Sequence, residues 1–136
     1  MKEDLKSLSK KWLKQAEYDL GDAKKAMSWG SFTLSCFLSQ QAAEKALNAF
    51  LYFSGVEEVW GHSVGTLCKE AINFDSSFET LLAQARALDK YYLPTRYPYA
   101  LPEDAVPSEV YQKEDAKLAH DKAEKILSFV KEKIFT

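Results

Sequence analysis

A short segment, residues 90–99, gathers the residue types best suited to holding an anion. Four of the seven tyrosines fall in it, and all four prolines lie between Pro94 and Pro107. Arg96 stands among them, a permanent cation with five donors in a planar fork. A guanidinium flanked by tyrosines suits a phosphate and a stacked base. A structural alternative is equally open, in which Arg96 caps carbonyl groups at a helix end while the tyrosines cover the core.

The residues around Arg96 extend this candidate site. Asp89 and Tyr92 lie three positions apart near the end of the preceding helix, so they face the same way. Pro98 restricts the conformation of Tyr97. We expect this group to form one side of a cleft. Tyr97 or Tyr92 stacks on a base there, and Asp89 helps to orient Arg96.

A second polar group interrupts an otherwise apolar helix at residues 40–47, QQAAEKAL. Glu44 lies four residues after Gln40, and Lys45 lies four residues after the next glutamine, so each pair shares a helix face. One interpretation is a solvated stripe. The other is a polar floor beneath a cleft, in which Glu44 pairs with Arg96.

The histidines and cysteines predict no metal or cofactor. His62 follows a glycine at a helix entrance, where we expect a capping role, and His120 is expected to be a surface or hydrogen-bonded residue within a helix. Neither these residues nor Cys36 and Cys68 show the spacing of metal ligands. The sequence assembles no serine–histidine–acid or cysteine–histidine group, and the scattered glycines form no phosphate loop.

Bulk properties predict one domain over residues 1–136, because a chain of this length buries a sizeable core. The net charge of −2 argues against a strongly basic nucleic-acid binder but leaves a local basic patch open. Apolar runs fall short of the ~18 residues of a membrane helix, and the N-terminus carries no apolar signal core. We expect a cytoplasmic protein with free thiols and no membrane contact.

Apolar residues recurring three and four positions apart predict helices over residues 3–28, 32–53, 63–73, 76–92 and 109–134. Gly30 is expected to end the first helix and Ser31 to cap the second. Ser76 and Glu79 fit a capping box. The second helix is so apolar that it should be central or pack on a second subunit. Period-two alternation is absent, so the predicted fold class is all-α: an up-and-down bundle of four long helices plus one short helix.

Three segments together resemble the HEPN domain family: residues 41–47 (QAAEKAL), residues 61–63 (GHS), and Tyr92 followed by residues 96–98 (RYP). The resemblance spans roughly residues 10–133. It implies an up-and-down bundle of four to five helices, a homodimer, and nucleotide binding. It also implies a small nucleotidyltransferase as partner, in a toxin–antitoxin-like module.

Many members of this family resemble metal-independent ribonucleases, in which a histidine follows an arginine after four to six intervening residues. Here residues 97–103 read YPYALPE, without a histidine. The resemblance therefore implies that Arg96 faces a phosphate but lacks its proton-transfer partner. It also implies that the cleft is lined by Glu44, Lys45, Asp89 and Tyr92.

The sequence thus predicts a protein that binds a nucleotide or an RNA phosphate. One alternative is a ribonuclease that uses His62 or His120 to transfer protons. Another is an interaction module whose tyrosine–proline loop binds a protein partner, since aromatic and arginine side chains are favoured anchors in interfaces.

Overall fold

The computed structural model describes residues 2–135, with side chains from residue 4 onward. It confirms the predicted all-α class, since the described residues form helices and no strand. The α-helices are α1 (Lys2–Ser28), α2 (Phe32–Phe53), α3 (Val64–Ile72), α4 (Leu82–Leu88), α5 (Pro107–Val110) and α6 (Lys113–Phe135). Three short 3₁₀ helices are η1 (Ser76–Leu81), η2 (Asp89–Tyr91) and η3 (Pro98–Ala100). None of the described helices combines the length and hydropathy needed to cross a bilayer.

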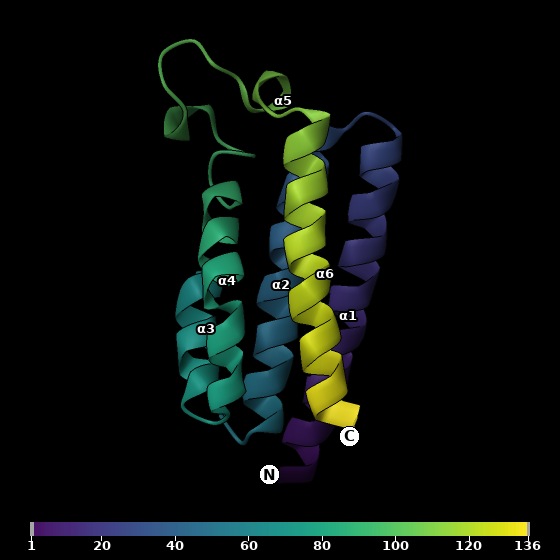
Figure 1. Ribbon diagram of the computed structural model, residues 1–136, viewed down its shortest axis with the longest axis vertical. Coiled ribbons are helices and arrows are strands. Elements are labelled where there is room, and N and C mark those ends of the chain that lie inside the picture. Colours follow the sequence, from purple (N-terminus) through teal and green to yellow (C-terminus); the bar gives the residue numbers. More distant parts are fainter. Residues whose placement is uncertain (1, 136) are drawn as a thin grey trace.

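The long helices run side by side along the molecule, with α3 and α4 paired next to α2 (Figure 1). The predicted central place of the second helix is confirmed, because α2 packs against α1, α3 and α6 and buries fourteen of its twenty-two residues. Small side chains permit this close packing. Ser9 Oγ donates to the carbonyl of Ala49 at 2.5 Å, and Ser35 Oγ donates to that of Ala23 at 2.7 Å, so both bonds join α1 to α2.

Aromatic rings join the second half of the chain to this core. Phe78 of η1 is fully buried, with its ring centre 4.2 Å from that of Phe50 and 4.9 Å from that of Phe129. The contact therefore links η1 to both α2 and α6. Burying an aromatic side chain of this size is worth a few kcal/mol, on the order of 2–3.

The first two helix junctions largely follow the prediction. Gly30 has φ of 82°, a conformation that favours glycine, and it ends α1. Ser31 precedes α2, but its side chain makes no capping hydrogen bond. Ser63 caps α3 by accepting from the backbone N–H of Thr66 at 3.1 Å.

The single helix predicted over residues 76–92 is wrong, because η1, α4 and η2 divide this segment. The predicted capping box is wrong as well. Asp75 is the cap instead, accepting from the backbone N–H of Ser77 at 3.0 Å and from its hydroxyl at 2.5 Å. Asp75 supplies a charged acceptor at the chain entry, so the cap lies one residue earlier than predicted and the turn that follows is a 3₁₀ helix.

The last predicted helix, 109–134, is also divided. Tyr111 is extended, with φ of −88° and ψ of 138°, and it separates α5 from α6. The side chain of Asp115 then accepts from the backbone N–H of Gln112 at 2.8 Å, which fixes a second helix start. The connection from Tyr92 to Gln112 therefore crosses one end of the bundle as short turns (Figure 1).

Candidate functional site

Arg96 lies in a cage of three aromatic rings. Its Cζ is 4.5 Å from the ring centre of Tyr92, 4.6 Å from that of Phe37 and 4.8 Å from that of Tyr97. Its Nε donates to the backbone carbonyl of Tyr92 at 3.0 Å. Ring faces attract a cation without neutralising its charge. Among the described residues, the terminal Nη atoms take part in no hydrogen bond or ion pair, so they remain available to a ligand.

The turn that presents Arg96 is fixed by local bonds. The backbone N–H groups of Arg96 and Tyr97 both donate to the carbonyl of Leu93 at 3.0 Å. Thr95 is buried, and its hydroxyl donates to the carbonyl of Tyr91 at 2.5 Å. Tyr97 is extended, with φ of −123° and ψ of 119°, as the following proline requires. The guanidinium is therefore held by a rigid turn.

His62 packs on Tyr92, one member of this cage. Its ring stacks on that of Tyr92, with the centres 4.9 Å apart and the planes 16° from parallel. Its Nδ1 lies 3.3 Å from Oε1 of Glu44, and its backbone carbonyl accepts from Nε2 of Gln40 at 3.2 Å. The predicted capping role of His62 is wrong, because Ser63 caps α3. The imidazole instead joins Glu44 to Tyr92, and through Tyr92 to Arg96.

Glu44 is the buried member of this group. Its side chain is 8% exposed, whereas that of His62 is 61% exposed. Burial raises the pKa of Glu44 above its ordinary value, and His62 and Gln40 partly oppose that shift. The expected pair between Glu44 and Arg96 is wrong, since the carboxylate bonds to His62 and to Gln40 Nε2. The buried carboxylate thus faces the imidazole, which presents most of its surface to solvent.

Asp89 has a different role from the one predicted. Its carboxylate accepts from the hydroxyl of Ser63 at 2.9 Å and from the backbone N–H groups of Val64 at 2.6 Å and Gly65 at 3.3 Å. These donors stand at the start of α3, where a helix offers unpaired N–H groups. Asp89 therefore does not orient Arg96. It ties the segment that carries His62 to the chain just before Tyr92.

Lys45 belongs to the packing of two helices. Its Nζ lies 2.5 Å from Oδ2 of Asp19 on α1, and Oδ1 of the same aspartate accepts from Nε2 of Gln15 at 2.9 Å. Of the six predicted site residues, Arg96, Tyr92 and Tyr97 are in direct contact. Glu44 reaches them through His62. Asp89 and Lys45 support the surrounding helices.

Of the two histidines considered for proton transfer, only His62 lies beside the Arg96 cage. His120 lies on α6, and among the described residues no contact joins it to the Arg96 cage. His62 is thirty positions from Tyr92, so only the packing of α3 against α4 brings the two rings together. The sequence held one signal of this contact, since Gln40 and Glu44 are polar residues on one face of a largely apolar helix. In the structure both side chains contact His62.

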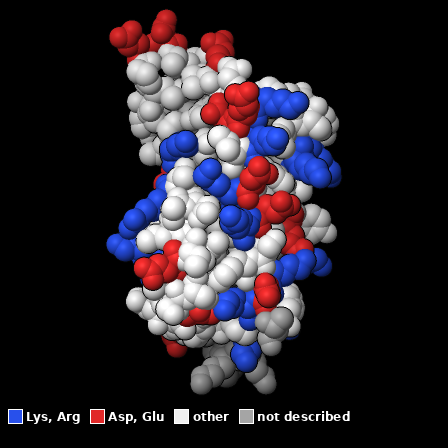
Figure 2. All heavy atoms as spheres, viewed as in Figure 1, with Lys and Arg blue, Asp and Glu red and all other residues white. Residues whose placement is uncertain are grey.

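Charge at the surface is mixed on the face shown in Figure 2. Basic and acidic side chains alternate over α1 and α6, and acidic side chains gather at the end of the molecule formed by residues 101–110, which include Glu103 and Asp104. This face therefore carries no broad basic field that would attract an anion, and the charge at Arg96 is a local feature. The arrangement can hold a phosphate at the guanidinium, offer an exposed ring for stacking, and exchange a proton at the imidazole.

Comparison with known proteins gives one family. The family model described as HEPN domain matches residues 9–133. Among curated proteins, Putative toxin MJ1304 from Methanocaldococcus jannaschii is 29% identical over 132 residues, covering 91% of this chain and 86% of that protein.

Solved structures agree with this match. TT1696 from Thermus thermophilus has a TM-score of 0.82 at 39% identity, covering 92% of this chain and 97% of that one. ST0689, an archaeal HEPN homologue, has a TM-score of 0.77 at 40% identity, covering 93% and 97%. A HEPN domain protein from Thermotoga maritima has a TM-score of 0.70 at 30% identity, covering 89% and 94%.

Proposed function

Since this chain belongs to the HEPN domain family, we propose that it binds the phosphate of a nucleotide or of RNA at Arg96. We further propose that it acts as a homodimer in a toxin–antitoxin-like module, with a small nucleotidyltransferase as partner. The observation that carries the proposal is the aromatic cage around Arg96. It holds the guanidinium in place by ring faces and one backbone carbonyl, and it leaves the charge without an acidic partner among the described residues.

Each aromatic residue of the cage has a distinct part in this proposal. Tyr97 is 40% exposed and lies next to Arg96, and its ring stacks on that of Tyr99 with the centres 5.6 Å apart, so a base would stack on Tyr97 in place of Tyr99. Tyr92 already contacts both His62 and Arg96, so it supports the site. Phe37 comes from α2 and anchors the guanidinium to the body of the bundle.

Calorimetric titration with AMP tests the role of Arg96. A charge-assisted phosphate contact contributes on the order of 1.5–3 kcal/mol, so Arg96→Ala should weaken AMP binding about 10–100-fold. The chain has one other arginine, the exposed Arg86, which gives a matched control. Arg86→Ala should bind AMP like the wild type. Equal affinity in Arg96→Ala and wild type would remove phosphate binding from Arg96.

The partner and the homodimer rest on different support. The relative from Methanocaldococcus jannaschii carries the name Putative toxin MJ1304, which favours a module with an antitoxin partner. Leu34 on α2 is 47% exposed and Tyr97 40%, so apolar surface next to the cage is available to a second copy. Light scattering at micromolar concentration should give twice the chain mass. A monomer would contradict the homodimer. A small nucleotidyltransferase encoded beside this protein should co-purify with it after co-expression, and failure to co-purify would contradict the proposed partner.

RNA cleavage is a second candidate, favoured by the Glu44–His62 contact. A carboxylate that accepts from Nδ1–H leaves Nε2 of the imidazole as a base toward solvent. With a phosphodiester held at Arg96, the ribose 2′-oxygen bonds to phosphorus as its proton passes to Nε2 of His62. The bond from phosphorus to the 5′-oxygen breaks, and that oxygen takes a proton from water. The products are a 2′,3′-cyclic phosphate and a 5′-hydroxyl.

Cleavage of an end-labelled single-stranded RNA separates this candidate from binding alone. His62→Gln should abolish cleavage and keep RNA affinity, while His120→Gln should cleave like the wild type. If the wild type leaves the RNA intact, or if His62→Gln cleaves at the same rate, the second candidate fails and phosphate binding at Arg96 is unaffected. Loss of a protein partner in Tyr97→Ala, with AMP binding unchanged, would instead favour the interaction module.

A further inference from the structure

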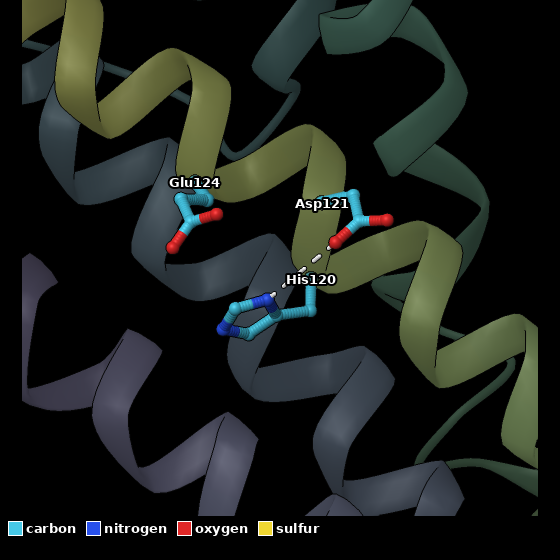
Figure 3. Close-up of side chains that lie close together, drawn as sticks. All are labelled: His120, Asp121 and Glu124. Atoms are coloured by element: carbon cyan, nitrogen blue, oxygen red, sulfur yellow. Dashed lines mark ion pairs between the residues drawn. The ribbon is translucent and has the colours of Figure 1, made fainter.

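A separate cluster of three potential metal ligands lies on α6. His120, Asp121 and Glu124 each offer one ligand atom, and these atoms all lie within 4.8 Å of one another. Figure 3 shows the imidazole directed away from the helix axis, with the carboxylates of Asp121 and Glu124 on either side of it. The spacing places His120 and Glu124 one helical turn apart on the same face. The cluster shares no residue with the Arg96 site.

The imidazole of His120 is unusual in its surroundings. Its side chain is only 11% exposed, yet its ring nitrogens still reach solvent and are not buried without a partner. Nδ1 faces Oδ1 of Asp121 at 3.9 Å, which is too long for a hydrogen bond. Within the described part of the chain, neither ring nitrogen has a partner at hydrogen-bond distance. A nitrogen lone pair is therefore available beside two carboxylates.

The two carboxylates are also left without a lysine. Helix α6 carries six lysines, yet the described ion pairs of Asp121 and Glu124 amount to the long contact with His120. Lys131 and Lys133 pair instead with Glu17 and Asp75. Two acidic groups and one imidazole thus offer ligand atoms within 4.8 Å of one another, and none of the described lysines forms an ion pair with them.

We propose that His120, Asp121 and Glu124 bind a divalent transition-metal ion of the Zn²⁺ class. A set of one nitrogen and two oxygen ligands suits such an ion. The same set suits Mg²⁺ and Ca²⁺ less well, because these ions take oxygen ligands. Bonds of about 2.0–2.2 Å to Zn²⁺ require the ligand atoms to approach to about 3 Å, and the exposed carboxylates can rotate to do so. Water completes the coordination. The ion would fix one face of α6 and stabilise the folded chain.

Titration of the full chain with ZnCl₂, followed by calorimetry and by the thermal unfolding midpoint, tests the site. The wild type should bind one ion per chain, with a rise in the unfolding temperature. Glu124→Gln keeps the size of the side chain but removes a ligand charge, and it should lower the affinity at least about tenfold. His120→Gln should do the same.

Two further variants separate this cluster from other sources of binding. Glu114→Gln makes the same charge change on an exposed residue of α6, and it should bind Zn²⁺ like the wild type. His62→Gln should also bind normally, although His62 lies beside Glu44. The proposal is overturned if the wild type takes up no Zn²⁺ at millimolar concentration. It is equally overturned if Glu124→Gln and His120→Gln bind as tightly as the wild type, or if His62→Gln abolishes binding.

Discussion

Nε of Arg96 donates to the backbone carbonyl of Tyr92 at 3.0 Å, and Cζ of the same guanidinium lies 4.5 Å from the centre of the Tyr92 ring. One residue thus binds Arg96 twice, through its backbone and through its side chain. Neither contact supplies a negative charge. The positive charge of Arg96 is held in place and remains available to an anion, which is the property that a phosphate site needs.

Substitution of Tyr92 tests this double contact. The ring face and the carbonyl hold Arg96, while the hydroxyl takes no part, so Tyr92→Phe should keep AMP affinity within about twofold of wild type. Tyr92→Leu removes the ring. Because a cation–π contact is worth about 0.5–2 kcal/mol, the affinity should fall roughly 2–30-fold. Calorimetry distinguishes the two variants, and an equal loss in both would show that the hydroxyl, not the ring face, matters.

Two glycines give opposite predictions for the same substitution. A Cβ on Gly65 would lie 2.9 Å from Cγ of Arg86 and 3.1 Å from Oδ2 of Asp89, so Gly65→Ala should lower the free energy of unfolding by about 1–3 kcal/mol. Gly21 is exposed within α1, and a Cβ there would meet no atom within 4 Å. Because alanine favours a helix more than glycine does, Gly21→Ala should raise the free energy of unfolding by about 0.5–1 kcal/mol. Urea denaturation measures both. Changes of the same sign would contradict the close approach of α3 and α4.

Asp89 should matter for stability through the start of α3. Asp89→Ala leaves two backbone N–H groups and a hydroxyl without their acceptor, at a cost of about 1–3 kcal/mol in the free energy of unfolding. Asp104→Ala, in the exposed connection, is a control of the same chemistry and should have little effect. Urea denaturation is the measurement. If Asp89→Ala unfolds at the same urea concentration as Asp104→Ala, the cap is unimportant.

Acid should weaken the contact between η1 and the end of α6. Hydrogen bonds from Ser77, and then from Lys133, lower the pKa of Asp75 from 3.8 to about 2. The folded state therefore keeps this carboxylate ionised where the unfolded chain protonates it. The stabilisation is complete above about pH 4 and is lost as the pH falls toward 2. NMR titration of the carboxyl carbon should give a midpoint near 2, which Lys133→Met should raise. A midpoint near 4 in the wild type would rule out these bonds.

Most of the bundle could be predicted because its cause is local. Apolar residues at helical spacing define α1, α2 and α6, and glycines and prolines mark where the helices end. The errors fall where two local signals compete. Asp75 offers a better acceptor than Ser76 and so begins η1, and Asp115 draws a new helix start after the extended Tyr111.

The site could be predicted only where its residues are near one another in the chain. Tyr92, Arg96 and Tyr97 meet within one turn, so their contact follows from the local sequence. Glu44 and Asp89 had several available partners, and the sequence does not rank them. The start of α3 offers Asp89 three donors at once, which outweighs a guanidinium further along the chain. The packing of α3 also places His62, which precedes this helix, beside Glu44, and this contact between distant parts of the chain could not be predicted from local sequence.

The most direct test of the phosphate site uses the arginine side chains themselves. The chain contains only Arg86 and Arg96, so NMR spectra of their ¹⁵N-labelled guanidinium groups hold one set of signals from each. On addition of AMP, the Nη signals of Arg96 should shift in a saturable way, because these atoms are the donors left open by the cage. The signals of Arg86 should stay in place. Unchanged Arg96 signals at AMP concentrations that saturate the calorimetric titration, or equal shifts of both arginines, would contradict the proposed site.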